Sequence, residues 1–144
     1  MQIEKIISGK LDNNTYVVKN NKNECIIIDA SANVEDIKDL VEDCSVKGVL
    51  LTHGHYDHFV NLDNIINAFD TKCYLSEFEL EKLYSPKLNY SIVFNTFSVF
   101  LCPGRVIFLF LSQHIYLKPI SFKELPLFTK VKAFCIQPKT LTVA

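Results

Sequence analysis

Residues 52–58, Thr-His-Gly-His-Tyr-Asp-His, constrain the fold of this chain more than any other segment. They follow directly on residues 46–51, an apolar run typical of a buried strand. The segment holds three of the four histidines of the chain together with an aspartate, and imidazole and carboxylate groups are natural ligands of zinc and similar metals. At a strand end they are placed to hold a metal at an exposed edge. The competing interpretation is a polar loop whose histidines face water.

The spacing inside this motif explains how its side chains meet. His53 and His55 are two residues apart, so in extended backbone they leave on the same side and can converge on one ion. Gly54 between them permits the sharp dihedral angles needed to leave a strand. Asp57 and His58 come where the apolar spacing becomes helical, and they are placed to serve a second ion nearby. Two adjacent metals polarise a carbonyl or phosphoryl group and deprotonate a bridging water, so metal-assisted hydrolysis is the leading reaction class.

The pattern His53-x-His55-x-Asp57-His58 after an apolar strand resembles the signature of the metallo-β-lactamase superfamily, especially its glyoxalase II-like (hydroxyacylglutathione hydrolase-like) branch. The resemblance extends over residues 1–100. Two further segments resemble strands of that family: residues 14–18 and 26–30. The resemblance implies an α/β fold of layered type, in which this chain forms the N-terminal half of a four-layer αββα sandwich.

The same resemblance implies roles for the motif residues. His53 and His55 would bind a first zinc ion, and Asp57 and His58 would bind a second. Asp57 would also act in catalysis by helping to hold and orient the nucleophilic water. The implied activity is zinc-dependent hydrolysis of a small-molecule thioester or other activated acyl compound. Nuclease-type and diiron flavoprotein branches of the superfamily fit this chain less well.

The chain also departs from the family pattern. A glyoxalase II-like dinuclear site needs five histidines and a second, bridging aspartate, whereas this chain has four histidines, the fourth being His114. The next family motif, His-Thr-Pro-Gly-His-Thr, is missing, and residues 136–141 keep only its proline. We therefore expect residues 1–144 to form a single, incomplete domain, family-like over 1–100 and atypical over 101–144. The alternative function is an inactive, truncated remnant that binds at most one metal, which leaves enzymatic activity open.

Charge changes along the chain at about the same place. Residues 1–90 contain 15 acidic and 9 basic side chains, a net charge of −6, whereas residues 91–144 contain 1 acidic and 6 basic side chains, a net charge of +5. The second part also lacks the consistent periodicity of the first. Two interpretations stay open: a basic, aromatic segment that covers another surface, or a tail altered by a frameshift or a truncated gene prediction. The second is favoured.

Composition limits the location and partners of the chain. An apolar fraction of 49% and a charged fraction of 22% are typical of a soluble globular domain. The N-terminus lacks the apolar core of a signal peptide, and the apolar residues 106–111 are too few to span a bilayer. Five widely spaced cysteines without a Cys-x-x-Cys pair indicate buried, reduced thiols. We expect a cytoplasmic protein with no nucleic-acid or membrane partner; the oligomeric state is not indicated.

Hydrophobic periodicity and turn residues predict the local structure. Strands are expected at residues 2–8, 15–18, 24–29, 46–51, 72–75, 99–101 and 105–111. Helices are expected at residues 34–44, from the motif to about residue 69, and from Ser76 to about residue 84. Ser76 and Glu79 form a capping-box pattern for the last of these helices. Asp29, at a strand end, has two possible roles: orienting a motif histidine or capping a turn.

Overall fold

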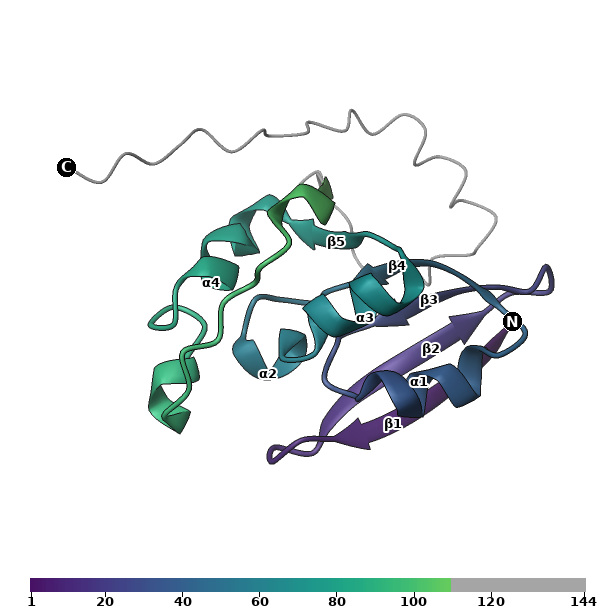
Figure 1. Cartoon of the computed structure of the whole chain (residues 1–144), viewed down its shortest axis with the longest axis horizontal. Helices are drawn as coiled ribbons and strands as arrows, with labels where there is room; N and C mark the ends of the chain where they lie inside the picture. Colours follow the sequence, from purple (N-terminus) through teal and green to yellow (C-terminus); the bar gives the residue numbers. More distant parts are fainter. Residues whose placement is uncertain (110–144) are drawn as a thin grey trace, which may run out of the picture.

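A six-stranded sheet organises the molecule, which is shown as a computed structural model in Figure 1 and whose structure describes residues 1–109. The strands follow one another in the sheet in sequence order. The strands are β1 (Gln2–Ser8), β2 (Asn13–Lys19), β3 (Glu24–Ile28), β4 (Ser45–Leu50), β5 (Cys73–Ser76) and β6 (Val106–Leu109). The first three strands pair antiparallel and the last four pair parallel, so the carboxyl ends of β3 and β4 meet at one edge of the sheet.

Short helices cover one face of this sheet. In Figure 1, α1 and α3 lie across the strands, and α4 lies beside β5. The helices are α1 (Val34–Val41), α2 (Tyr56–Phe59), α3 (Leu62–Phe69) and α4 (Leu80–Tyr84), with 3₁₀ turns η1 (Glu77–Glu79), η2 (Ser91–Phe94) and η3 (Pro103–Arg105). The expected α/β class is therefore confirmed: one sheet and one helical layer correspond to half of the predicted four-layer sandwich.

The core lies between the sheet and the helices because alternate strand residues point toward α1 and α3. Val17, Ile27 and Val49 supply the strand side of this core, and Ile37 and Ile65 supply the helix side, all with no exposed surface. On the opposite face of the sheet the alternation leaves apolar side chains open to solvent. The most exposed of these, on β1, are Ile3 and Ile7, each 57% exposed.

The structure corrects two predicted elements. Residues 99–101 do not form a strand: the Phe100 N–H donates to the carbonyl of Leu83 at 2.9 Å, and the Leu101 N–H donates to the carboxylate of Asp63. These backbone groups therefore bind helices α4 and α3, and β6 takes the place beside β5. Of the strand expected at 105–111, β6 is the described part, and residues 110–111 lie outside the described residues.

The single helix expected from the motif to residue 69 is divided into α2 and α3. The division arises because the His58 carbonyl accepts a hydrogen bond from the Ala30 N–H at 2.7 Å, so this carbonyl does not take part in a continuous helix. The Asn61 N–H in turn donates to the Ala30 carbonyl at 3.0 Å. The chain after β3 thus holds the chain after β4 in a fixed position. The apolar periodicity of α3 does not predict these hydrogen bonds to Ala30.

Candidate metal centre

The motif lies at the carboxyl edge of the sheet, directly after β4. Asp29 follows the neighbouring strand β3, and its N–H donates to the Leu50 carbonyl at 2.9 Å. Asn13 begins β2 at the same edge, because β2 runs antiparallel to β3. His55 directly precedes helix α2, at its N-cap position. Three strand ends therefore surround the motif, as expected for a site built at the edge of a largely parallel sheet.

The first two histidines converge. His53 Nε2 lies 3.0 Å from His55 Nδ1. Two nitrogens that each lie at the usual distance from a tetrahedral zinc ion are about 3.3 Å apart, so this pair has nearly the spacing that a shared ion requires. The convergence follows from the two-residue separation across Gly54, as the sequence predicted.

Asp57 and His58 form a second pair beside the first. His58 Nε2 lies 3.6 Å from Asp57 Oδ2, which is again close to the separation of two ligands on one ion. The His58 and His53 rings have centroids 4.1 Å apart, so the two pairs are neighbours. Asn13 Nδ2 donates to Asp57 Oδ2 at 2.7 Å and to the Asp57 carbonyl at 3.0 Å, which fixes the carboxylate. The donor chemistry and spacing fit metal binding, which stays a prediction for all four residues.

Of the two roles expected for Asp29, the structure shows the first: Asp29 contacts a motif histidine, and its other oxygen binds the backbone of Thr52, 23 residues away, and not its own turn. Its Oδ2 accepts a hydrogen bond from His58 Nδ1 at 2.9 Å, and its Oδ1 accepts from the Thr52 N–H at 2.8 Å. The Asp29 side chain is buried, and its backbone is left-handed with φ of 59°. The hydrogen bond to Asp29 raises the pKa of His58 against the opposing effect of burial. Because Nδ1 carries the proton, the lone pair of Nε2 is the one available to a metal.

The environment of His53 favours its neutral form. Burial lowers the pKa of His53, and the neighbouring rings of His58 and His55 lower it further. A neutral imidazole is the form that binds a metal, since protons compete with the ion for the ring nitrogen. The lowered pKa of His53 therefore favours metal binding by this ring near neutral pH.

Glu79 also holds the motif in place, although the sequence pattern predicts a capping role for it. The predicted capping box is wrong: Ser76 makes no side-chain capping hydrogen bond. Glu79 Oε2 instead accepts from the Gly54 N–H at 2.9 Å, and both carboxylate oxygens accept from Lys82 Nζ at 2.8 and 2.7 Å. A carboxylate 25 residues away therefore holds the glycine between the two converging histidines. The capping-box pattern concealed this contact, because the same Glu was assigned to its own helix.

The described part of the ligand set is limited to these pairs. Across residues 1–109, no group of three or more His, Cys, Asp or Glu side chains is arranged to hold a metal ion. His114, the remaining histidine, lies outside the described residues. Each pair supplies two of the four ligands that zinc usually takes, so further ligands are required for a closed site.

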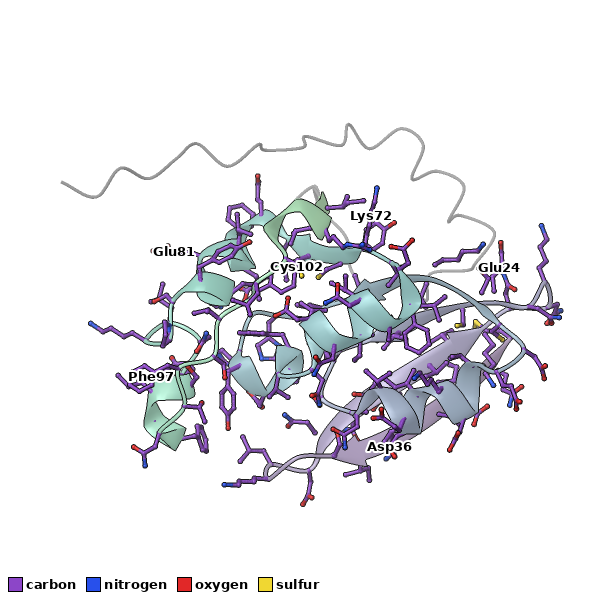
Figure 2. All side chains as sticks on the ribbon, viewed as in Figure 1. Glu24, Asp36, Lys72, Glu81, Phe97 and Cys102 are labelled. Carbon is purple, nitrogen blue, oxygen red and sulfur yellow. The ribbon has the colours of Figure 1, made fainter. Side chains whose placement is uncertain are left out.

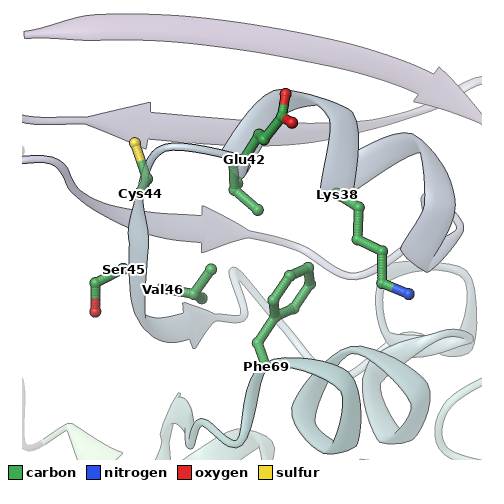
Figure 3. Close-up of a pocket in the computed structure, with 7 residues that line it drawn as sticks. Lys38, Glu42, Cys44, Ser45, Val46 and Phe69 are labelled. Carbon is green, nitrogen blue, oxygen red and sulfur yellow. The ribbon is translucent and has the colours of Figure 1, made fainter.

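A separate hollow of about 490 Å³ lies at the other end of the sheet (Figure 3). It is lined by Lys38, Val41, Glu42, Cys44, Ser45, Val46 and Phe69. These residues stand at the end of α1, at the start of β4 and at the end of α3, whereas the motif follows the far end of β4. The hollow is therefore distinct from the candidate metal centre.

Comparison with known proteins decides the family. Residues 8–90 match the model of the Metallo-beta-lactamase superfamily, and this match covers more than half of the chain. The chain belongs to the metallo-beta-lactamase superfamily. Among curated members and relatives, a probable metallo-hydrolase of Streptococcus pyogenes serotype M6 is 37% identical over 94 residues, covering 63% of this chain and 40% of that protein.

A further relative is an uncharacterized protein of Aquifex aeolicus, 38% identical over 77 residues, which cover 53% of this chain and 36% of that protein. This metallo-beta-lactamase superfamily chain thus spans less than half the length of the curated relatives that it matches.

Solved structures support the same fold. The crystal structure of BLEG-1, a B3 metallo-beta-lactamase, matches with a TM-score of 0.58 and 30% identity, over 62% of this chain and 44% of that chain. The structure of TTHA1623 in a di-iron-bound form matches with a TM-score of 0.55 and 21% identity, over 67% and 48% of the two chains. The second likeness concerns the fold alone. Within residues 1–109 of this superfamily member, no helix has the length and apolar character needed to cross a bilayer.

Proposed function

We propose that this chain belongs to a zinc-dependent hydrolase of the glyoxalase II-like branch, which cleaves a thioester or another activated acyl substrate. The single observation that carries the proposal is the pair of histidine nitrogens, His53 Nε2 and His55 Nδ1, held 3.0 Å apart beside a second pair. A bound zinc ion supplies Lewis acidity and lowers the pKa of water. The donors are imidazole and carboxylate groups, which suit zinc and also iron, so the metal has to be measured.

The residues around such a centre have different roles. His53 and His55 would hold the first ion, and Asp57 and His58 would hold the second. The Asp57 carboxylate, held by Asn13, also accepts a hydrogen bond from the attacking water and orients it. The water oxygen bonds to the acyl carbon, the carbon–sulfur bond breaks, and the products are a carboxylic acid and a thiol. Asp29 keeps the His58 ring in the orientation that presents Nε2.

The second candidate function is an inactive remnant that binds at most one metal. It is favoured by one observation: among residues 1–109, ligand-type side chains meet in pairs and not in groups of three or more. This candidate predicts less than one equivalent of zinc per chain and no thioester cleavage. The hydrolase predicts about two zinc ions per chain together with cleavage.

Metal analysis and thioester assays of the purified full chain distinguish the two candidates. For the hydrolase, both zinc content and turnover fall in His55→Ala and in Asp57→Ala. Asp70→Asn is the matched control, because Asp70 is a carboxylate whose side chain is 88% exposed and which pairs with Arg105 away from the motif. Zinc below one equivalent and no turnover by the native chain would favour the remnant. Turnover that survives His55→Ala would refute the assigned ligands.

A further inference from the structure

The segment after α4 turns back onto the motif and presents aromatic rings beside it. The Tyr56 N–H, next to His55, donates to the Asn89 carbonyl at 3.0 Å. The Tyr90 ring meets the His55 ring edge-on, with centroids 4.8 Å apart. The Phe94 ring meets Tyr56, with centroids 5.1 Å apart. We call Tyr56, Tyr90 and Phe94 the aromatic wall.

Buried hydrogen bonds hold this segment in place. Asn89 has no exposed surface, its Nδ2 donates to the Ser98 carbonyl at 2.8 Å, and its Oδ1 accepts from the Ser91 N–H at 2.9 Å. The Thr96 N–H donates to the Ser91 carbonyl at 3.0 Å. The Asn89 side chain thus links both ends of this segment by hydrogen bonds, which hold the backbone that carries the neighbouring Tyr90 ring.

Tyr90 adopts a backbone conformation that tyrosine rarely takes. Its φ is 65°, in the left-handed region, and its side chain is 53% exposed. A bulky residue in this region is strained, and such strain persists only where the surroundings impose it, most often at ligand-binding and active sites. The strain here is not balanced by burial of the Tyr90 ring. Its visible result is a ring kept at the surface against a candidate metal ligand.

The segment that carries Tyr90 and Phe94 is apolar and almost uncharged. Neighbouring side chains of the same segment are exposed: Ile92 by 47%, Val93 by 68% and Phe97 by 73%. Phe97, labelled in Figure 2, lies beside η2. Lys87 is the one charged residue between residues 86 and 98, and the nearby Lys82 ammonium is already bound by Glu79. Several exposed apolar side chains in one short segment are typical of a binding surface, and this segment offers little to a charged group.

We propose that the aromatic wall binds the acyl group of the substrate, and that this group is apolar, aromatic or of medium chain length, and uncharged. The inference rests on the proposed function, whose substrate class it narrows. Tyr90 is the specificity-determining residue, because its ring touches His55 and lies where an acyl group bound at the metal centre would pass. A second copy of the chain is the other occupant that the test below separates.

The test measures acyl selectivity of the full chain loaded with zinc. N-acetylcysteamine thioesters of acetyl, hexanoyl and phenylacetyl groups keep the thiol constant. We expect the native chain to prefer the two larger acyl groups, and Tyr90→Gly to reduce that preference roughly tenfold, chiefly through KM, as loss of one ring contact predicts. Glycine accepts the left-handed backbone, so this variant removes the ring without adding strain. Tyr90→Phe keeps the ring and should keep the preference.

Two controls separate failure of this inference from failure of the proposed function. Calorimetry of phenylacetate and acetate binding to the zinc-loaded chain gives a readout without turnover. The ratio of phenylacetate affinity to acetate affinity should fall in Tyr90→Gly and stay unchanged in Tyr90→Phe and in Phe78→Ala. Phe78→Ala is the matched variant, since Phe78 is an aromatic residue outside the wall that is 76% exposed. If the native chain takes up zinc and turns over thioesters, but Tyr90→Gly leaves the acyl selectivity unchanged, this inference is overturned and the proposed function is not. Absence of zinc uptake would overturn the proposed function and this inference with it. A change of oligomeric state in Tyr90→Gly, with unchanged selectivity, would assign the wall to a second copy.

Discussion

Replacing Gly54 by alanine tests how tightly the motif is held against α4. A Cβ added at Gly54 would lie 2.7 Å from the Lys82 Cβ and 2.8 Å from the Glu79 carbonyl oxygen, far inside normal contact distances of about 3.5–4.0 Å. One obstacle is backbone and the other is the base of a side chain, so neither yields without movement of η1 and α4. The motif loop must therefore shift, and with it the Gly54 N–H that donates to Glu79.

Overpacking of this kind costs about 1–3 kcal/mol. The backbone of Gly54 is not in the left-handed region, so alanine also restricts the unfolded chain, which returns about 0.4–1 kcal/mol. We expect Gly54→Ala to lower the free energy of unfolding by about 1–2 kcal/mol, and the urea midpoint by roughly 1 M, in circular dichroism titrations. Zinc uptake should fall as well, because His53 and His55 flank the displaced residue.

Gly48→Ala is the matched control in β4. There the added Cβ would meet the Tyr74 ring, with Tyr74 Cε2 the nearest atom, within the sheet and away from the motif loop. We expect a loss of stability with unchanged zinc uptake. Equal stability and equal zinc uptake of Gly54→Ala and the native chain would refute the close approach of α4 to the motif.

Three further results are expected. Asp29→Asn should weaken zinc binding roughly 10–100-fold in competition titrations with a chromophoric chelator, because the His58 ring loses the carboxylate that orients it; unchanged affinity would count against that role. Burial acts to raise the pKa of Glu79, but hydrogen bonds from Lys82 and from Gly54 outweigh it and lower the pKa below 4.5. The associated stability is present above pH 4.5 and is lost as pH falls through the lowered pKa, so the acid limb of a stability–pH profile should be flatter in Glu79→Gln. Removal of zinc by a chelator should lower the Tm of the loaded chain, with recovery that depends on zinc concentration; a Tm insensitive to zinc would exclude binding to the folded state.

Local patterns were sufficient to predict the strand, the bend and the convergence of the motif. A two-residue spacing places His53 and His55 on one side of extended backbone, and the structure keeps that arrangement. Asp29 was also recognised as a candidate for orienting a motif histidine, and the structure places it at the end of the neighbouring parallel strand. The spacing inferences worked because each depends on backbone geometry within a few residues.

Contacts between distant segments were not predictable in the same way. Glu79 matched a local capping pattern, yet its carboxylate accepts a hydrogen bond from the Gly54 N–H, because η1 lies close to the motif. The helix after the motif is divided because Ala30 takes the His58 carbonyl. Residues 99–101 have the composition of a strand, but their amides meet α3 and α4. In each case a tertiary partner outweighed the local preference.

Long-range proton–nitrogen NMR of the histidine rings during zinc addition tests the central claim most directly. The account predicts that zinc shifts His53 Nε2 and His55 Nδ1, while His58 Nδ1 keeps its proton because Asp29 holds it. Zinc-induced shifts that leave both His53 and His55 unchanged would contradict the assignment of this motif as a metal site.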